Sequence, residues 1–383
     1  MNSALKNHAT YINNKVDTNE ISLSQYISTD NILQNKQGIE CATSLPIQGG
    51  KVTAFKKGDI LLANIRPYLK KIWYAQFDGG CSADVLAIRA NAETDSHFLF
   101  YALFRDDFFI HAMKGAKGTK MPRGDKTQIM EFKIPVFDLK TQQSIAAVLS
   151  ALDKKIALNK QINARLEEMA KTLYDYWFVQ FDFPDANGKP YKSSGGDMVF
   201  DETLKREIPK GWEPFKLSEL VTLSTGKEDA NFATEQGIYP FFTCSEKILK
   251  CDVYSFDTQA ILLAGNGTFS VKRFTGRFNA YQRTYVLEPK SKNLYPIVYF
   301  VIIDNVIKFT SGSRGSIIKF ITRGDIEHID VVLPNDIENM RFSEVLYTYL
   351  LQAELLEKQN HQLTQLRDFL LPMLMNGQVS VAE

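Results

Sequence analysis

The chain has 383 residues, of which 44% are hydrophobic and 12% aromatic, and its formal net charge is +1. A folded chain of this length is expected to form two or more domains rather than one core. No apolar run approaches the roughly 18 residues of a membrane helix, and the first residues, MNSALKNHATYINNK, lack the hydrophobic stretch expected of a secretory signal. The four cysteines lack Cys-x-x-Cys spacing, which favours free thiols in a cytoplasmic protein over a zinc site.

The first part of the chain, residues 1–140, is predicted to form a globular unit of mixed strands and helices. Its opening 20 residues are polar and without periodicity, which predicts an N-terminal arm. Alternating or wholly apolar runs then predict strands, and a run with an aromatic face predicts a helix. These elements are the strands Lys51–Phe55, Asp59–Asn64 and Val85–Ile88 and the helix His97–Met113. A Gly- and Lys-rich loop, 114–125, leads to a strand that ends at Pro135.

A long helix, Thr141–Phe178, follows this unit within the segment 141–180. Its apolar residues recur at steps of three and four, and no glycine or proline interrupts it. At 1.5 Å per residue such a helix spans roughly 55 Å. One compact domain cannot bury that length, so the helix is expected to need a partner helix.

The rest of the chain repeats this order. A stretch rich in Pro, Gly, Ser and Asp, 181–211, predicts a linker, and a second mixed unit, 212–336, and a second helical segment, 337–383, follow it. The run Ile60–Ala63 recurs as Ile261–Ala264, and Asn64 and Asn266 come after the two copies. A shift of 197 residues places Leu166 on Leu363 in the helices. The chain is therefore a tandem duplication of a globular unit and a long helix.

Two copies in one chain are expected to pack about a pseudo-two-fold axis, with their helices antiparallel in a coiled coil. The predicted fold class is α+β, with two mixed α/β domains separated by this helix pair. The asparagines on the seam, among them Asn159, would fix the register or would reach solvent at the seam's edge. Met169 and Leu366 follow the same period. The predicted seam residues are Leu149, Leu152, Ile156, Asn163, Leu166, Leu346, Tyr349, Leu356, Asn360 and Leu363.

The helical segments carry a resemblance to a known family. The stretch QQSIAAVLSALDKKIALNKQINARLEEMAKTLYDYWF, followed by FDFPDANGKPYKSSGG, resembles the central conserved region of the specificity (S) subunit of type I restriction–modification enzymes. The later stretch LLEKQNHQLTQLRDFLLPMLMNGQV resembles that family's C-terminal conserved region. The resemblance implies two target-recognition domains, 1–140 and 212–336, that each read one part of a bipartite site in double-stranded DNA. The helices between them would set the gap.

The same resemblance implies partners and cofactors. The helices would dock two modification (methyltransferase) subunits, to which two restriction (translocase and nuclease) subunits can add. S-adenosylmethionine, ATP and Mg²⁺ would then belong to those partners, and the chain itself would be a non-catalytic subunit without a cofactor or metal. Trp177, Phe178 and Phe181 could form a docking patch for a partner, or they could cap the helix seam or pack on a recognition domain.

Two features of each unit are candidates for DNA contact. Gly-rich loops with Lys, Arg and hydroxyl side chains suit phosphate binding, although a solvated basic loop has the same composition. Polar residues after each Ile-Leu-Leu-Ala strand could read bases, since Asn pairs with adenine and Arg with guanine, although Asn266-Gly267 could simply be a hairpin turn. The candidates are Asn64, Arg66, Tyr68, Lys70, Lys71, Lys117, Thr119, Lys120, Arg123, Asn266, Thr268, Lys272, Arg273, Arg277, Arg283, Ser313, Arg314, Ser316 and Lys319.

Catalytic motifs do not emerge from the sequence. Gly226-Lys227 lacks the earlier glycine of a phosphate-binding loop, and no methyl-donor loop or methylation motif is present. Glu131 and Lys133 after Asp125 only faintly resemble a metal-dependent nuclease. Two other functions remain open: a coiled-coil scaffold for proteins, which the paired basic loops disfavour, and a nuclease or methylase with motifs not recognised.

Overall fold

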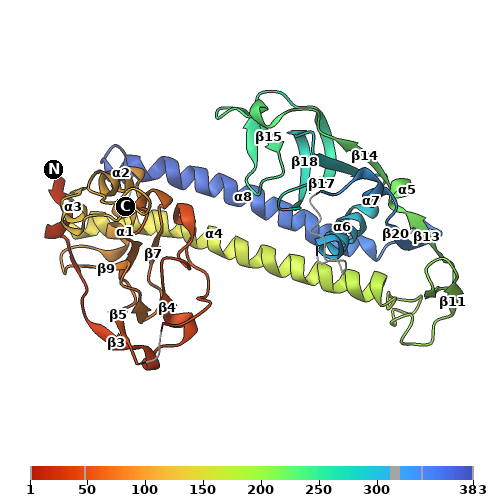
Figure 1. Ribbon diagram of the computed structural model, residues 1–383, viewed down its shortest axis with the longest axis horizontal. Coiled ribbons are helices and arrows are strands. Elements are labelled where there is room, and N and C mark those ends of the chain that lie inside the picture. Colours follow the sequence, from red (N-terminus) through yellow and green to blue (C-terminus); the bar gives the residue numbers. More distant parts are fainter. Residues whose placement is uncertain (1, 47–48, 311–319, 338–339, 382–383) are drawn as a thin grey trace. The chain divides into compact units, whose positions relative to one another are not determined.

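The computed structural model describes residues 2–46, 49–310, 320–337 and 340–381. The chain divides into two compact units (Figure 1): unit 1 comprises Met1–Ala157 and Asn360–Glu383, and unit 2 comprises Leu158–Gln359. Unit 1 is therefore built from two separate stretches of the chain, and unit 2 from one. Within its described residues, the chain has no helix that combines the length and the apolar character needed to cross a membrane.

Unit 1 contains two four-stranded sheets and a short strand pair. One sheet has the order β2-β9-β6-β7, and the other has the order β3-β5-β8-β4. The strands are β1 (Asn2–Ala4), β2 (Ala9–Tyr11), β3 (Lys15–Asp17), β4 (Tyr26–Ile27), β5 (Lys51–Phe55), β6 (Ile60–Ala63), β7 (Ile72–Tyr74), β8 (Gly79–Cys81), β9 (Val85–Ala90) and β10 (Lys133–Pro135). All of them pair in antiparallel fashion except β4 with β8, which are parallel.

Strand β6 lies between two apolar cores, which explains its uninterrupted apolar sequence. Ile60 and Leu62 face the core formed with helices α1 (Ser96–Phe104) and α2 (Asp106–Lys114), whereas Leu61 faces the core shared with Phe55 of the second sheet. A strand that is buried on both faces loses the alternation of polar and apolar residues. The three predicted strands are thus present as β5, β6 and β9.

Two local predictions for unit 1 are wrong. The helix predicted at His97–Met113 is divided, because Arg105 has extended backbone angles (φ −68°, ψ 148°) and α2 begins at the acidic pair after it. The predicted N-terminal arm is part of the fold instead. Strand β1 pairs with β10, Leu5 is fully buried, and the amide of Leu5 donates to the Phe132 carbonyl at 2.8 Å. That pairing partner lies far along the chain, beyond the reach of a local pattern.

Unit 2 contains a six-stranded sheet of order β14-β19-β17-β18-β15-β16 and two strand pairs, β11-β12 and β13-β20. Its strands are β11 (Met198–Asp201), β12 (Arg206–Pro209), β13 (Trp212–Lys216), β14 (Val221–Thr225), β15 (Tyr239–Phe242), β16 (Leu249–Cys251), β17 (Phe256–Ala264), β18 (Val271–Ala280), β19 (Thr284–Pro289) and β20 (Asp330–Pro334). Helix α6 (Leu294–Thr310) packs on one face of the sheet, and α5 (Leu217–Leu220) and α7 (Arg323–Glu327) lie in the same core. The segment expected to be a linker holds the β11–β12 hairpin.

The long helices are α4 (Leu139–Tyr174) and α8 (Ser343–Met375), and α4 continues into a π-helical turn at Asp175–Val179. Helix α4 begins two residues before the predicted start, and the Asp138 carboxylate accepts from the Thr141 amide at 2.9 Å. The short helix α3 (Lys126–Met130) precedes β10.

Each unit contains one segment of α4 and one of α8, and polar contacts join the two. In unit 1, Asn360 donates to the Ile156 carbonyl at 3.3 Å and Arg367 donates to Asp153 at 2.8 Å. In unit 2, Asn159 donates to Gln359 at 2.6 Å and Asn163 donates to Glu357 at 3.2 Å. In each unit, the residue number on α8 falls as the number of its contact on α4 rises. The two segments within a unit therefore run antiparallel.

The predicted seam residues lie on the inner sides of these segments. Leu149, Ile156, Leu346 and Leu356 are buried, and the remainder are half-buried: Leu152, Asn163, Leu166, Tyr349, Asn360 and Leu363. The extrapolation of the period to Met169 and Leu366 is wrong, because their side chains are 48% and 45% exposed. Ala170 is fully buried in place of Met169. An α-helix drifts relative to a strict seven-residue repeat, and here the buried face has moved by one residue.

Candidate nucleic-acid interface

In unit 1 the two candidate segments of the sequence meet at the end of β6. The Gly124 amide donates to the Asn64 carbonyl at 3.0 Å, and the Arg66 amide donates to the Pro122 carbonyl at 2.7 Å. Lys117 and Arg123 exchange two backbone hydrogen bonds of 2.9 Å, which close the Gly-rich loop on itself. Residues 64–71 and 114–125 therefore form one surface, called the first corner below.

The cations of the first corner divide into exposed and engaged groups. The side chains of Lys117 and Arg123 are largely open to solvent, and Thr119 and Lys120 are exposed as well. Arg123 forms an ion pair of 3.0 Å with Asp84. Lys70 pairs with Asp106 at 3.0 Å, and Lys71 donates to the Thr29 carbonyl, so both hold the loop in place. Tyr68 is 51% exposed. The exposed group is the part of this corner suited to phosphate contact.

Asn64 and Arg66 lie deeper than their predicted role requires. Asn64 is only 9% exposed, and its side-chain oxygen is buried without a hydrogen-bond partner among the described residues. A Cβ at Gly124 would lie 2.8 Å from that oxygen, so the glycine leaves room for the amide. Arg66 has a left-handed backbone (φ 52°) and a buried Nε. A bidentate contact to adenine needs both the oxygen and the nitrogen of the amide, so the buried oxygen of Asn64 disfavours this role, which stays a prediction.

Unit 2 has an equivalent second corner at the end of β17, formed by residues 265–268, 282–285 and 320–321. The Gly265 amide donates to the Arg283 carbonyl at 2.8 Å, and the Ile321 amide donates to the Gly265 carbonyl at 2.8 Å. In unit 1 the Asn64 amide likewise donates to the Asp84 carbonyl at 2.8 Å. These contacts place Gly265, and not Asn266, at the position of Asn64. The sequence comparison pairs Asn64 with Asn266, which is one residue further along the chain than the structural equivalent.

Several predicted contacts of unit 2 are used inside the unit. Arg273 has a side chain only 5% exposed, pairs with Glu167 of α4 and lies over the ring of Tyr299 at 4.5 Å. It cannot reach DNA, so that prediction is wrong. Lys272 donates to the Ser245 carbonyl at 2.6 Å, and burial lowers the pKa of its ammonium group.

The other candidates of unit 2 stay at its surface. Thr268 donates to the Cys244 carbonyl at 3.1 Å. Arg277 is half-exposed, pairs with Asp257 at 3.0 Å and lies over the Tyr254 ring. Arg283 is exposed, and Asn266 is half-buried. Four candidates in the Gly-rich loop fall outside the described residues: Ser313, Arg314, Ser316 and Lys319.

The aromatic residues at the end of α4 do not form an exposed patch. Trp177, Phe178 and Phe181 are buried in the core of unit 2. The Phe178 ring lies 5.9 Å from that of Trp212 and 5.6 Å from that of Phe342. The docking interpretation is therefore wrong, and the alternative, that they pack on the globular part of their unit, is confirmed.

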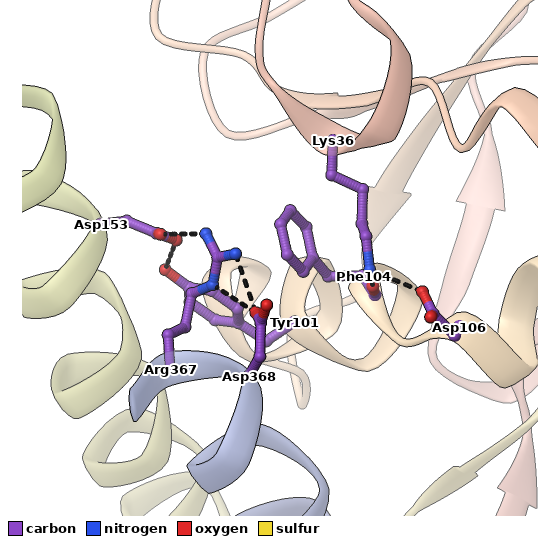
Figure 2. A network of polar contacts seen from close by, with 7 residues as sticks. All are labelled: Lys36, Tyr101, Phe104, Asp106, Asp153, Arg367 and Asp368. Carbon is purple, nitrogen blue, oxygen red and sulfur yellow. Dashed lines mark hydrogen bonds and ion pairs between the residues drawn. The ribbon is translucent and has the colours of Figure 1, made fainter. Parts of the chain in front are cut away.

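A buried polar network in unit 1 was missed from the sequence (Figure 2). The Tyr101 hydroxyl of α1 donates to Asp153 of α4 at 2.6 Å, and Arg367 of α8 donates to the other oxygen of Asp153 at 2.8 Å. Arg367 also lies over the Phe104 ring at 4.9 Å and bonds Asp368. One carboxylate thus joins the globular part to both long helices. An arginine on the apolar face of α8 was the available signal.

Unit 2 has a comparable junction. The Tyr295 hydroxyl of α6 donates to the buried Glu354 of α8, and Thr275 of β18 donates to the same carboxylate at 3.0 Å. Burial raises the pKa of Tyr295, and Glu354 raises it further. Among the described residues no group of three His, Cys, Asp or Glu side chains could hold a metal ion.

Each of the two units has a polar corner at the end of a buried strand and a junction between its globular part and the long helices, which defines a protein built from a repeated unit. The family model described as "Type I restriction modification DNA specificity domain" matches the chain twice, at residues 4–168 and 209–365. The chain belongs to this family. The two matches end 197 residues apart, as the helix alignment predicts, and they confirm the duplication.

Individual relatives and one solved structure agree with that assignment. The chain is 44% identical over 181 residues to the type I restriction enzyme EcoDI specificity subunit of Escherichia coli, and this match covers 45% of the chain but only 40% of that relative. It is 24% identical over 320 residues to the MjaIX specificity subunit of Methanocaldococcus jannaschii, covering 75% of the chain and 70% of that relative. The crystal structure of an S subunit from M. genitalium superimposes with a TM-score of 0.59 at 15% identity, covers 98% of this chain and 96% of that chain, and shares the fold.

Proposed function

We propose that the chain is the DNA-specificity subunit of a type I restriction–modification complex. It binds a bipartite site in double-stranded DNA, each unit reads one half-site, and the chain performs no catalysis. The observation that carries this proposal is the double match to the specificity-domain family. The exposed cations of the first corner, Lys117, Lys120 and Arg123, supply the phosphate contacts that such binding requires.

The proposal includes partners that supply the chemistry. Two modification subunits transfer methyl groups with S-adenosylmethionine, and two restriction subunits use ATP and Mg²⁺ for translocation and cleavage. The complex acts in the cytoplasm. Because the aromatic residues at the end of α4 are buried in unit 2, the partners would dock on the outer faces of the long helices, where the exposed side chains of Leu158, Ile162 and Leu355 lie.

We further propose that α4 and α8 form one antiparallel coiled coil along their common length, related by a pseudo-two-fold axis. The opposite directions of their contacts within each unit support this arrangement. The functional division would then be a recognition domain at 1–140, a spacer helix at 141–180, a connection at 181–211, a second recognition domain at 212–336 and a second spacer helix at 337–383. A helix pair of fixed length would set the number of base pairs between the half-sites.

Methylome sequencing of cells that express the chain with its modification subunit tests the function. The expected product is one methylated motif with two defined halves and a fixed gap. Deleting a few residues within Ala157–Arg165 should change the gap and leave both halves unchanged. Altered halves with an unchanged gap would contradict the proposed role of the helices.

The cationic surface is tested by combining Lys117→Ala, Lys120→Ala and Arg123→Ala. Each lost phosphate contact should reduce the slope of log affinity against log salt by about 0.9. Arg165→Ala, which removes an exposed helix arginine paired with Glu168, is the matched control and should leave the slope unchanged. An unaltered slope in the triple variant would remove the first corner from the DNA interface.

A further inference from the structure

The second corner contains a recess that the proposed function does not by itself explain. A cavity of about 450 Å³ opens beside the end of β17, close to the start of β19. It is lined by Gly265, Asn266, Gln282, Arg283, Tyr285, Phe320 and Ile321. The lining combines amide groups, one guanidinium group and two aromatic rings.

Hydrogen bonds hold the backbone of this recess in place. The Arg283 carbonyl accepts from the Gly265 amide at 2.8 Å and from the Cys244 thiol at 3.4 Å. The Tyr285 hydroxyl donates to the Ile321 carbonyl at 3.0 Å. A Cβ at Gly265 would lie 2.7 Å from the Arg283 carbonyl oxygen, so only glycine allows this close approach. The site is therefore preorganised around the position of Arg283.

The guanidinium group of Arg283 is the distinctive feature of this recess. Its side chain is exposed, and among the described residues it takes part in no ion pair. The equivalent position in unit 1 is Asp84, whose charge is neutralised by Arg123 at 3.0 Å. At this structural position unit 2 thus has an arginine without an ion pair among the described residues, whereas unit 1 has a paired aspartate. Because this position differs between otherwise repeated units, it is suited to make the two half-sites different.

The lining favours a base edge over a phosphate. Among the described lining residues Arg283 is the one cation, and Gln282 is bonded to the Asp229 carboxylate at 3.1 Å. A carboxylate beside the recess repels a phosphate, whereas a base edge carries no net charge. Phe320, which is 63% exposed at the rim, offers an apolar wall to a base or a thymine methyl group.

We propose that this recess reads a guanine in the half-site bound by unit 2. Arg283 donates two parallel hydrogen bonds to the O6 and N7 atoms of that guanine, and Asn266 faces the neighbouring base pair. An arginine fork on these two acceptors is the commonest specific contact in the major groove. This inference rests on the proposed function and names one base that the function leaves open.

The first test is the methylome of Arg283→Gln, expressed as the full chain with its modification subunit. The wild type should show a fixed guanine in one half-site, and the variant should lose the preference for guanine at that single position by roughly 10- to 100-fold. The control is Arg323→Gln, which alters an exposed arginine of the same unit that pairs with Glu327. It should leave the motif unchanged. A uniform fall of methylation with the motif retained would show that Arg283 contacts a phosphate and would overturn the proposal.

A second test uses altered DNA and does not depend on how the variant folds. The purified wild-type complex is titrated with a duplex in which each guanine of the motif is replaced in turn by 7-deazaguanine, which lacks the N7 acceptor. Binding should weaken by about 10-fold at one guanine of the half-site read by unit 2, and Arg283→Gln should not respond to that replacement. No effect at any guanine of this half-site overturns the proposal. If the wild type methylates no bipartite motif, the proposed function fails instead.

Discussion

The network around Asp153 gives the sharpest prediction of stability. Tyr101→Phe removes one hydroxyl that is buried, since Tyr101 is 2% exposed, and that donates to a carboxylate at 2.6 Å. A hydrogen bond to a charged group contributes about 1.5–3 kcal/mol. Asp153 is partly exposed and keeps Arg367 as a donor, so the loss of unfolding free energy should fall near the lower limit, about 1.5 kcal/mol.

Thermal and urea unfolding of the full chain measure this loss. For a unit of this size 1 kcal/mol shifts Tm by about 2–4 °C, so the transition of unit 1 should fall by about 3–6 °C. Tyr68→Phe removes the hydroxyl of an exposed tyrosine in the same unit and should change stability by less than about 0.5 kcal/mol. Equal effects of the two substitutions would refute the argument that Asp153 joins the globular part to the helices.

A double-mutant cycle with Arg367→Met extends the test. Because Tyr101 and Arg367 share the Asp153 carboxylate, their effects should not add, and the interaction free energy should be at least about 0.5 kcal/mol. Strict additivity would mean that the two contacts are independent.

Three further predictions concern the cores and the second corner. Burial raises the pKa of Tyr295 above its usual value of 10, so this tyrosine ionises in the unfolded state before it ionises in the folded state. The free energy of unfolding should therefore fall as pH rises above 10, by up to about 1.4 kcal/mol per pH unit. Thermal melts at about pH 8–11.5 measure this fall. Gly265→Ala should cost about 1–3 kcal/mol in urea unfolding, because the new Cβ meets the Arg283 carbonyl, whereas Gly324→Ala, with no atom nearer than 3.9 Å, should be neutral or stabilising. Phe178→Ala should cost about 3–5 kcal/mol in unfolding, and a stable variant with weakened partner binding would restore the docking interpretation.

Sequence patterns correctly predicted those elements that are determined by residues close together in the chain. The apolar run of β6 and the long period of α4 each follow from a few neighbouring residues, and the duplication follows from comparing one half with the other. The pairing of β1 with β10 and the burial of Arg273 against α4 depend on residues that are distant in the sequence. A basic residue near a candidate loop has the same appearance in the sequence whether it faces solvent or a carboxylate.

The candidate site shows the same limit at finer scale. Asn64 and Asn266 look equivalent in the sequence because each follows an Ile-Leu-Leu-Ala strand. The backbone hydrogen bonds instead make Gly265 the structural equivalent of Asn64. A displacement of one residue in a loop leaves no trace in composition or periodicity. It determines, however, whether an amide faces the interior or the surface.

The discontinuous construction of unit 1 has a consequence for the order of folding on the ribosome. Its core contains Leu5 and Phe98 from the beginning of the chain and Leu371, Leu374 and Met375 from α8. Residues 360–383 are synthesised after the whole of unit 2. The core of unit 1 therefore cannot be completed until these residues appear, whereas all residues of unit 2 are already available for folding. During that interval the apolar face of α4 in unit 1 is uncovered, and nascent chains should be most prone to aggregation or chaperone capture at this stage.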